Sequence, residues 1–187
     1  MSGAFFESVE GGQDPALVSE AADRAAHLLV RGAHESGDDG VAERLLHLAD
    51  TEGIEAIAEV WSGSPADSLA GSLWRLFVLR QWVHAEPATL ARDFEAGRER
   101  AEVAHVLAGV ADPPGPDQLW AMVDEVLRGI ATGEYADVLL RAAAFARVVA
   151  AGRAARHDVT DAEVVRLLEV AEQLEAAGHA ELAGRLA

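Results

Sequence analysis

Apolar residues recur at intervals of three and four positions along most of this 187-residue chain. That spacing places them on one face of an α-helix. Sustained alternation of apolar and polar residues, the pattern of a half-buried strand, is absent. The chain also contains 39 Ala but only three Ile and four Thr. The sequence therefore predicts an all-α fold.

Proline, capping residues and glycine divide the chain into about eight predicted helices. They begin near residues 15, 39, 51, 66, 87, 117, 135 and 160. We expect them to form one domain, residues 1–187, of which 1–13 are an N-terminal arm. Thr160 and Glu163 have the spacing of a capping box at the start of the last helix, and Gly178 is predicted to end it.

The segment 66–84 differs from the other predicted helices because it is apolar nearly all round. Leu76 and Phe77 share one face of the helical wheel, and Trp74 and Trp82 lie on another. A helix with apolar residues on all sides is typical of the centre of a helical domain. We therefore expect this Trp-rich helix to be central, with Trp74, Phe77 and Trp82 largely buried.

Arg80 falls in the middle of the apolar face of this segment. A buried guanidinium must be paired or hydrogen-bonded, because a bare buried charge is strongly destabilising. In one interpretation a carboxylate of a neighbouring helix pairs with Arg80, or its side chain reaches solvent at the helix end. In the other, Arg80 and His84 bind an anionic ligand in a pocket beside Trp74 or Trp82.

Residues 59–83 align without gaps on residues 125–149, at an offset of 66 positions. Leu73 and Leu139 are one of the identical pairs in this alignment. Two duplicated helical hairpins would produce it, and so would a chance match between helices rich in Ala and Leu. The sequence leaves both explanations open.

Negative charge is concentrated at the two ends of the chain. The sequence has 32 acidic residues against 15 Arg and no Lys, which gives a formal net charge of −17. Residues 1–60 hold 13 acids and three Arg, and residues 157–187 hold seven acids and two Arg. This balance argues against nucleic-acid binding, because contacts with phosphate groups need clustered basic residues.

The acidic ends have two interpretations. They are either solvated outer helices around a central core or a surface that docks on a basic protein. For the second interpretation, the predicted partner contacts are two aromatic residues and three acids near the N-terminus, namely Phe5, Phe6, Asp38, Asp39 and Glu43. Phe5 and Phe6 could equally fold back onto the core.

Glu102 and His105 have the Glu-x-x-His spacing of di-iron helical bundles, which need two such motifs. A second motif is absent and the chain has no Cys, so we expect no metal, no cofactor and no catalytic residues. The longest charge-free stretch has nine residues, too few to cross a membrane. The first residues lack the features of a secretory signal, and we expect a cytoplasmic protein.

Four segments of the chain resemble a family of small acidic helical proteins from high-GC bacteria. These segments are Phe5–Pro15, Asp50–Ile54, Leu73–Leu76 and Pro113–Pro116, and the resemblance extends over most of the chain. Some members of the family carry names that mention an RNA polymerase β subunit. The resemblance therefore implies at most an association with the transcription machinery, and it carries over no catalytic residues.

These observations favour a non-enzymatic, acidic protein-interaction domain that docks a basic protein surface. The sequence does not identify the partner. The alternative is a helical domain that binds a small ligand, or a regulatory domain, with a pocket near Arg80. A metal-dependent helical enzyme is the least favoured class, because only one Glu-x-x-His motif is present.

Overall fold

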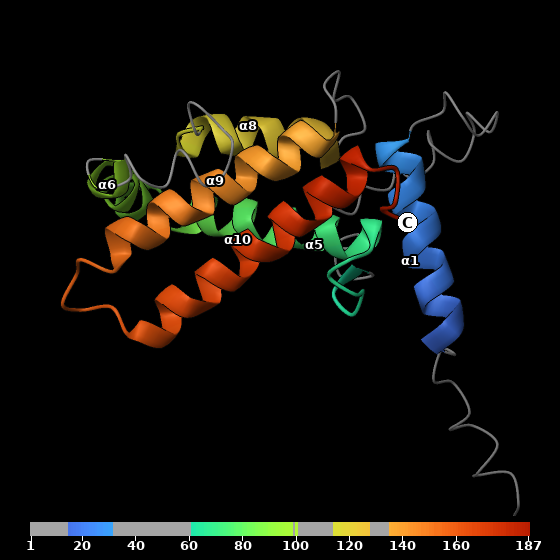
Figure 1. Ribbon diagram of the computed structural model, residues 1–187, viewed down its shortest axis with the longest axis horizontal. Helices are drawn as coiled ribbons and strands as arrows, with labels where there is room; N and C mark the ends of the chain where they lie inside the picture. The colour runs from blue at the N-terminus through green and yellow to red at the C-terminus, as the bar shows by residue number, and fades with distance from the viewer. Residues whose placement is uncertain (1–14, 32–60, 99, 101–113, 128–134) are drawn as a thin grey trace, which may run out of the picture.

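The computed structural model describes residues 15–31, 61–98, 100, 114–127 and 135–187 (Figure 1). All regular secondary structure in these ranges is helical, which confirms the all-α prediction for them. The helices are α1 Pro15–Val30, α5 Leu69–Ala85, α6 Pro87–Arg98, α8 Pro116–Leu127, α9 Tyr135–Arg153 and α10 Asp161–Leu182. The helices predicted near residues 39 and 51 lie outside the described ranges, so the total of eight is not confirmed.

Side-chain caps fix where two of the helices begin. α5 begins at Leu69, three residues later than predicted. The reason is that the Ser68 side chain accepts a hydrogen bond from Gly71 N at 3.0 Å and caps the helix there. α10 begins after the predicted capping box, in which Thr160 N donates to Glu163 Oε2 at 2.9 Å.

α10 continues through Gly178 to Leu182, so the prediction that Gly178 ends this helix is wrong. Gly178 is buried, and a Cβ atom at this position would lie 2.9 Å from Leu140 Cγ of α9. The glycine therefore allows α9 and α10 to pack closely rather than ending the helix. The chain turns later, at Gly184, whose φ of +63° lies in the region that favours glycine.

α9 is the most enclosed of the described helices, whereas the prediction places 66–84 at the centre. α9 packs along α10 and crosses α6, and 13 of its 19 residues are buried. α5 buries nine of its 17 residues, among them Phe77. On its other face Trp74 and Trp82 are only half-buried and Val78 is 42% exposed. The small alanine side chains of α9 let the neighbouring helices approach it from several sides. The prediction that α5 is the central helix is therefore not confirmed.

α6 and α9 cross with their backbones in direct contact at two glycines. A Cβ atom on Gly97 would lie 1.8 Å from Val148 O, and one on Gly152 would lie 1.8 Å from Asp93 O. No residue with a side chain fits at these distances. The two glycines therefore set the separation between α6 and α9.

A buried hydrogen bond joins the first turns of α5 and α9. Tyr135 Oη and Ser72 Oγ are 2.8 Å apart, and Ser72 donates its only hydroxyl proton to Leu69 O at 2.7 Å. Tyr135 must therefore be the donor to Ser72. Burial raises the pKa of Tyr135 above its ordinary value of 10.0.

α1 is held to the remainder of the described chain by polar contacts as well as by apolar packing. Trp61, which is fully buried, donates from Nε1 to Ala22 O of α1 at 3.1 Å. Arg31, just after α1, forms a two-point ion pair with Glu181 of α10, in which Nη2 and Oε2 are 2.8 Å apart. Figure 1 shows the C-terminal segment beside α1.

The alignment of 59–83 with 125–149 places Leu69 opposite Tyr135, and these residues begin α5 and α9. The elements that follow the two helices differ. One residue separates α5 from α6, whereas seven residues separate α9 from α10. An internal duplication therefore stays a prediction.

Candidate functional site

Arg80 has a carboxylate partner on a neighbouring helix, which is one of the two outcomes that the sequence leaves open. Its Nη2 atom lies 2.7 Å from Asp124 Oδ1 of α8, and the two side chains are 13% and 12% exposed. The guanidinium also lies over the Trp120 ring, 5.2 Å from the ring centroid. A largely buried ion pair therefore joins α5 to α8.

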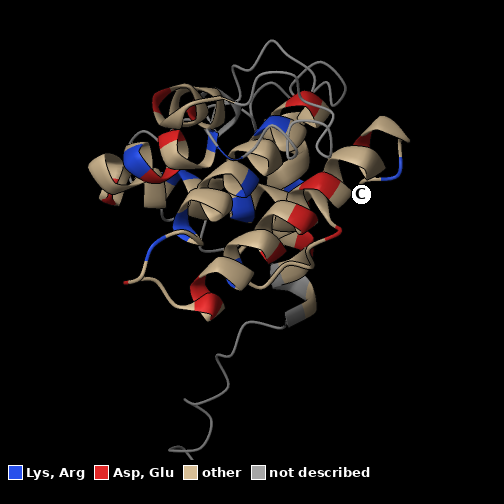
Figure 2. Ribbon diagram, turned by 60° about the vertical axis from the view of Figure 1, so that its left-hand side comes forward, with Lys and Arg blue, Asp and Glu red and all other residues tan. Residues whose placement is uncertain are grey.

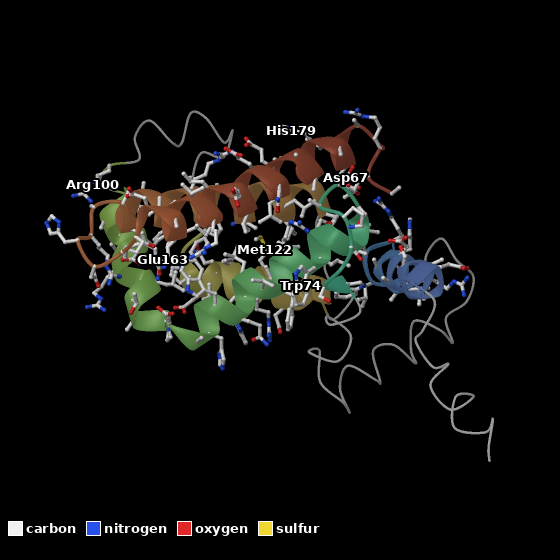
Figure 3. The ribbon with its side chains drawn as sticks, turned by 90° about the horizontal axis from the view of Figure 1, so that it is seen from below. Asp67, Trp74, Arg100, Met122, Glu163 and His179 are labelled. Carbon is white, nitrogen blue, oxygen red and sulfur yellow. The ribbon has the colours of Figure 1, made fainter. Side chains whose placement is uncertain are left out.

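The other three residues of the predicted ligand pocket have different surroundings. Trp74, labelled in Figure 3, stacks on Phe77 of its own helix with ring centroids 5.7 Å apart. Trp82 faces the guanidinium of Arg153 of α9, which lies 4.6 Å from the ring centroid. His84 is exposed. A ligand-binding role for these residues stays a prediction.

Two buried donors in the α5–α8 contact have no acceptor among the described residues. They are Arg80 Nε and Trp120 Nε1. A buried donor without a partner costs about 1–3 kcal/mol of folding free energy. The hydrogen bonding of this contact is therefore incomplete within the described ranges.

Several predicted site residues lie outside the described ranges. They are the partner contacts Phe5, Phe6, Asp38, Asp39 and Glu43, and the motif residues Glu102 and His105. Within the described ranges, no three His, Cys, Asp or Glu side chains gather in a way that could hold a metal ion. None of the described helices is long and apolar enough to cross a membrane.

A second arginine arrangement lies where α6 crosses α9, and its centre is a buried carboxylate. Asp93 of α6 is 2% exposed. It accepts hydrogen bonds from Arg153 Nε at 2.9 Å and from Arg156 Nη1 at 3.0 Å. Arg153 Nη2 also lies 3.6 Å from Glu86 Oε2. Two guanidinium groups thus stabilise a carboxylate in a position where burial alone would disfavour its charge.

Arg156 is held by carboxylates on two sides. Besides its bond to Asp93, it donates to Asp158 from Nε at 2.9 Å and from Nη2 at 2.5 Å. The hydrogen bonds with Asp158 and Asp93 raise the pKa of Arg156, and the bonds from Arg156 lower the pKa of Asp158. These contacts fix the position of the Arg156 guanidinium.

Asp93 is not among the site residues predicted from the sequence, although the sequence contains a signal for it. Leu90, Phe94 and Gly97 lie three and four positions from Asp93 and are buried with it on one face of α6. A carboxylate within an inward-facing apolar stripe indicates a cationic partner. The stripe does not identify the helix that supplies this partner.

The Asp93 arrangement forms one wall of a cleft of about 390 Å³. The cleft is lined by Arg92, Asp93, Ala96, Arg100, Gly152, Ala155 and Arg156. Arg92 and Arg100 are exposed, and within the described ranges neither has a carboxylate partner. Figure 3 shows Arg100 at the end of the molecule where the turn between α9 and α10 lies.

The acidic residues of the α10 region divide into two groups. Asp158, Glu175 and Glu181 are paired with arginines, and Glu163 caps the helix. The other group is exposed, and among the described residues it has no ion-pair partner: it consists of Asp161, Glu169 and Glu172. Figure 2 shows acidic positions recurring along the helix that ends near the C-terminus.

Comparisons of the chain with protein-family models, with curated proteins and with solved structures give no match. Function is therefore inferred from the geometry and charge of the described residues. The resemblance to acidic helical proteins from high-GC bacteria stays a prediction.

The chemistry available at the cleft is binding rather than proton transfer. Arginine stays protonated in proteins, so Arg92, Arg100 and Arg156 cannot act as general bases. Asp93 has both oxygens occupied by guanidinium groups. The cleft therefore offers fixed positive charge and hydrogen-bond donors.

Proposed function

We propose that this protein is a non-enzymatic helical interaction domain that docks a positively charged surface of a protein partner. The observation that carries the proposal is the exposed group of acids on α10, Asp161, Glu169 and Glu172, which is free of arginine partners among the described residues. A basic partner could reach these carboxylates without breaking any internal ion pair.

The exposed acids of α10 surround an exposed apolar side chain. Asp161, Val165, Glu169 and Glu172 follow one another at spacings of three and four positions and so share one helix face. Val165 is 51% exposed. Exposed ion pairs each contribute only about 0–1 kcal/mol and are screened by salt, so a docking surface needs several charges and an apolar contact. Val165 supplies such a contact within the described residues.

The wider charge pattern supports the same proposal. The formal net charge of −17 opposes self-association and favours a basic partner. We propose that residues 1–60, with 13 acids and three Arg, extend the docking surface and that Phe5 and Phe6 add an apolar anchor. The proposal places an eight-helix domain in the cytoplasm, and the resemblance points to a basic protein of the transcription machinery as the partner.

The test compares two triple variants that change the net charge equally. One is Asp161→Asn, Glu169→Gln and Glu172→Gln on α10. The matched control is Glu95→Gln, Asp117→Asn and Asp137→Asn, which removes three exposed acids of other helices. Each variant and the unmodified protein serve as bait in native lysate, and bound proteins are quantified by mass spectrometry.

We expect a partner that the α10 variant loses and the control retains. In a purified pair, we expect the α10 variant to lower the association rate by about tenfold at low salt, with a smaller effect at high salt. Equal losses in both variants would show that only overall charge matters. A salt-independent association rate would contradict the proposal.

A small-ligand pocket near Arg80 is the second candidate function. The observation that favours it is the pair of buried donors without acceptors, Arg80 Nε and Trp120 Nε1. An anionic ligand that accepts from both donors should change the fluorescence of Trp120. Titration of anionic metabolites against the protein and a Trp120→Phe variant would test this, and a signal retained in the variant would contradict it.

A further inference from the structure

We propose that the arginine-lined cleft at the α6–α9 crossing binds a small molecule that carries a phosphate group. Arg92, Arg100 and Arg156 are the residues that would contact the phosphate. This site is separate from the acidic face of α10 and does not depend on the protein-interaction proposal.

The first argument is the excess of positive charge at the cleft. Arg153 and Arg156 are offset by Asp93, Asp158 and Glu86. Arg92 and Arg100 have no carboxylate partner among the described residues. Among the described residues Arg92 donates only to its own helix, to Ala88 O at 3.3 Å and to Thr89 Oγ1 at 3.4 Å.

Arginines without a carboxylate partner among the described residues are notable in a chain that has 32 acids for 15 Arg. Set against the carboxylates of Asp93, Asp158 and Glu86, the four arginines leave a formal net charge of about +1 among the described residues at the cleft. A phosphomonoester carries about −1.5 to −2 charges at pH 7 and so is attracted to this excess. Arginine also binds phosphate oxygens through two parallel N–H groups, which Arg92 or Arg100 could offer.

The second argument is that the cleft is rigid where it would hold the ligand. The contact between Gly97 and Gly152 fixes α6 against α9 beneath the cleft. Asp93 and Asp158 hold the Arg156 guanidinium from two sides. Arg156 Nη2 has a second N–H beyond the one that it donates to Asp158. A donor held in place before the ligand arrives loses little conformational freedom on binding.

The third argument is size. The cleft has a volume of about 390 Å³, near the lower end of the range of small-molecule sites. Inorganic phosphate would occupy only a part of it. Ala96, Gly152 and Ala155 line the remainder with small groups that leave room for the carbon skeleton of a phosphorylated metabolite.

The experiment is a calorimetric titration of the full chain at low salt with three probes. The probes are inorganic phosphate, ribose 5-phosphate and succinate. The test variant is Arg92→Gln with Arg100→Gln. The control variant is Arg98→Gln with Arg166→Gln, which removes two exposed arginines that do not line the cleft. Circular dichroism of each protein checks that all four substitutions leave the helices intact.

We expect ribose 5-phosphate to bind the unmodified protein more tightly than inorganic phosphate does. We expect the test variant to weaken this binding by about tenfold or more and the control to change it by less than about twofold. Equal binding of phosphate and ribose 5-phosphate would overturn the metabolite assignment in favour of a free-phosphate site. Tighter binding of succinate would overturn the phosphate assignment. Equal losses in both variants, or no binding at millimolar probe, would overturn the site itself.

Discussion

The contact between α6 and α9 and the contact between α5 and α8 both bury an arginine–carboxylate pair, but they are built in opposite ways. Between α6 and α9 the carboxylate is central, and Asp93 accepts from both Arg153 and Arg156. Between α5 and α8 the arginine is central, and Arg80 faces Asp124 and the Trp120 ring.

This difference determines which polar groups remain without a hydrogen-bond partner. A central carboxylate has its two oxygens satisfied by two guanidinium groups, and these groups have Glu86 and Asp158 as further partners. A central arginine in a helix interface has donors on several sides, and here Arg80 Nε finds no acceptor among the described residues. The α6–α9 contact is therefore the more completely bonded, and it should be the more sensitive to substitution.

The largest expected effect tests this ranking directly. We expect Asp93→Asn to lower the free energy of unfolding by about 3–5 kcal/mol, because Arg153 and Arg156 lose the buried carboxylate that joins them. We expect Asp124→Asn to cost about 1–3 kcal/mol, because Arg80 keeps its contact with the Trp120 ring. Urea unfolding at pH 7 measures both values. A larger loss for Asp124→Asn would reverse the comparison.

The control for Asp93 is Glu95 on the same helix. Glu95 is 69% exposed in its side chain and lies 3.7 Å from Arg98. We expect Glu95→Gln to change the free energy of unfolding by less than about 1 kcal/mol. A loss as large as that of Asp93→Asn would mean that the acidity of α6, rather than the buried arrangement, is responsible.

The next effect concerns the glycines that bring α6 and α9 together. Gly152→Ala should lower the free energy of unfolding by about 2–3 kcal/mol, because the new methyl group would overlap Asp93 O and push the helices apart. Gly63→Ala is the matched control, since a Cβ there meets nothing within 4 Å. Thermal unfolding of the two variants gives the difference. Equal melting temperatures for Gly152→Ala and Gly63→Ala would show that α6 and α9 can move apart without loss of stability.

A smaller effect is expected on the α5 side of the comparison. Tyr135→Phe should lower the free energy of unfolding at pH 7 by about 1 kcal/mol, because the buried hydrogen bond to Ser72 is lost. Burial raises the pKa of Tyr135 in the folded protein above 10.0, so wild-type stability should fall as the pH rises above that value. The Tyr135→Phe variant has no hydroxyl group to ionise, so this part of the loss of stability at alkaline pH should be absent from it. If wild type and Tyr135→Phe lost stability identically as the pH rose, ionisation of the buried Tyr135 would not be the cause.

The smallest effect concerns the turn that supports Arg156. The pKa of Asp158 is lowered below 3.8 by its bonds from Arg156, so this contact stabilises the fold above that pH and is lost as the pH falls through the lowered value. Asp158→Asn should therefore lower the urea midpoint slightly at pH 7, and its difference from the wild type should vanish in acid. Glu169→Gln, at an exposed position in the middle of α10 without an ion-pair partner in the described chain, should show no such difference at any pH.

The features that follow from local chain chemistry could be predicted from the sequence. The helical fold follows from residue spacing, the start of α6 from Pro87, and the start of α10 from Thr160 and Glu163. A carboxylate partner for Arg80 was one of two predicted alternatives, because the energy of a buried charge demands compensation wherever the helix lies.

The features that depend on how helices meet could not be predicted. A helical wheel shows which face of α6 points inward, but not that α9 lies there, so the pairing of Asp93 with Arg153 and Arg156 was missed. Gly178 has the local signature of a helix end and instead serves close packing against Leu140. The cleft combines residues about 60 positions apart, and no local pattern links them.

The ion pair between Arg31 and Glu181 has a consequence for the order of folding. The two residues are 150 positions apart, and a ribosome adds residues one after another from the N-terminus. The α1 helix is therefore synthesised long before α10, and its link to α10 cannot close until Glu181 has emerged. Contacts between such distant residues slow folding, because a long loop must close before they form. The closing of this ion pair should thus be among the last steps of biosynthetic folding.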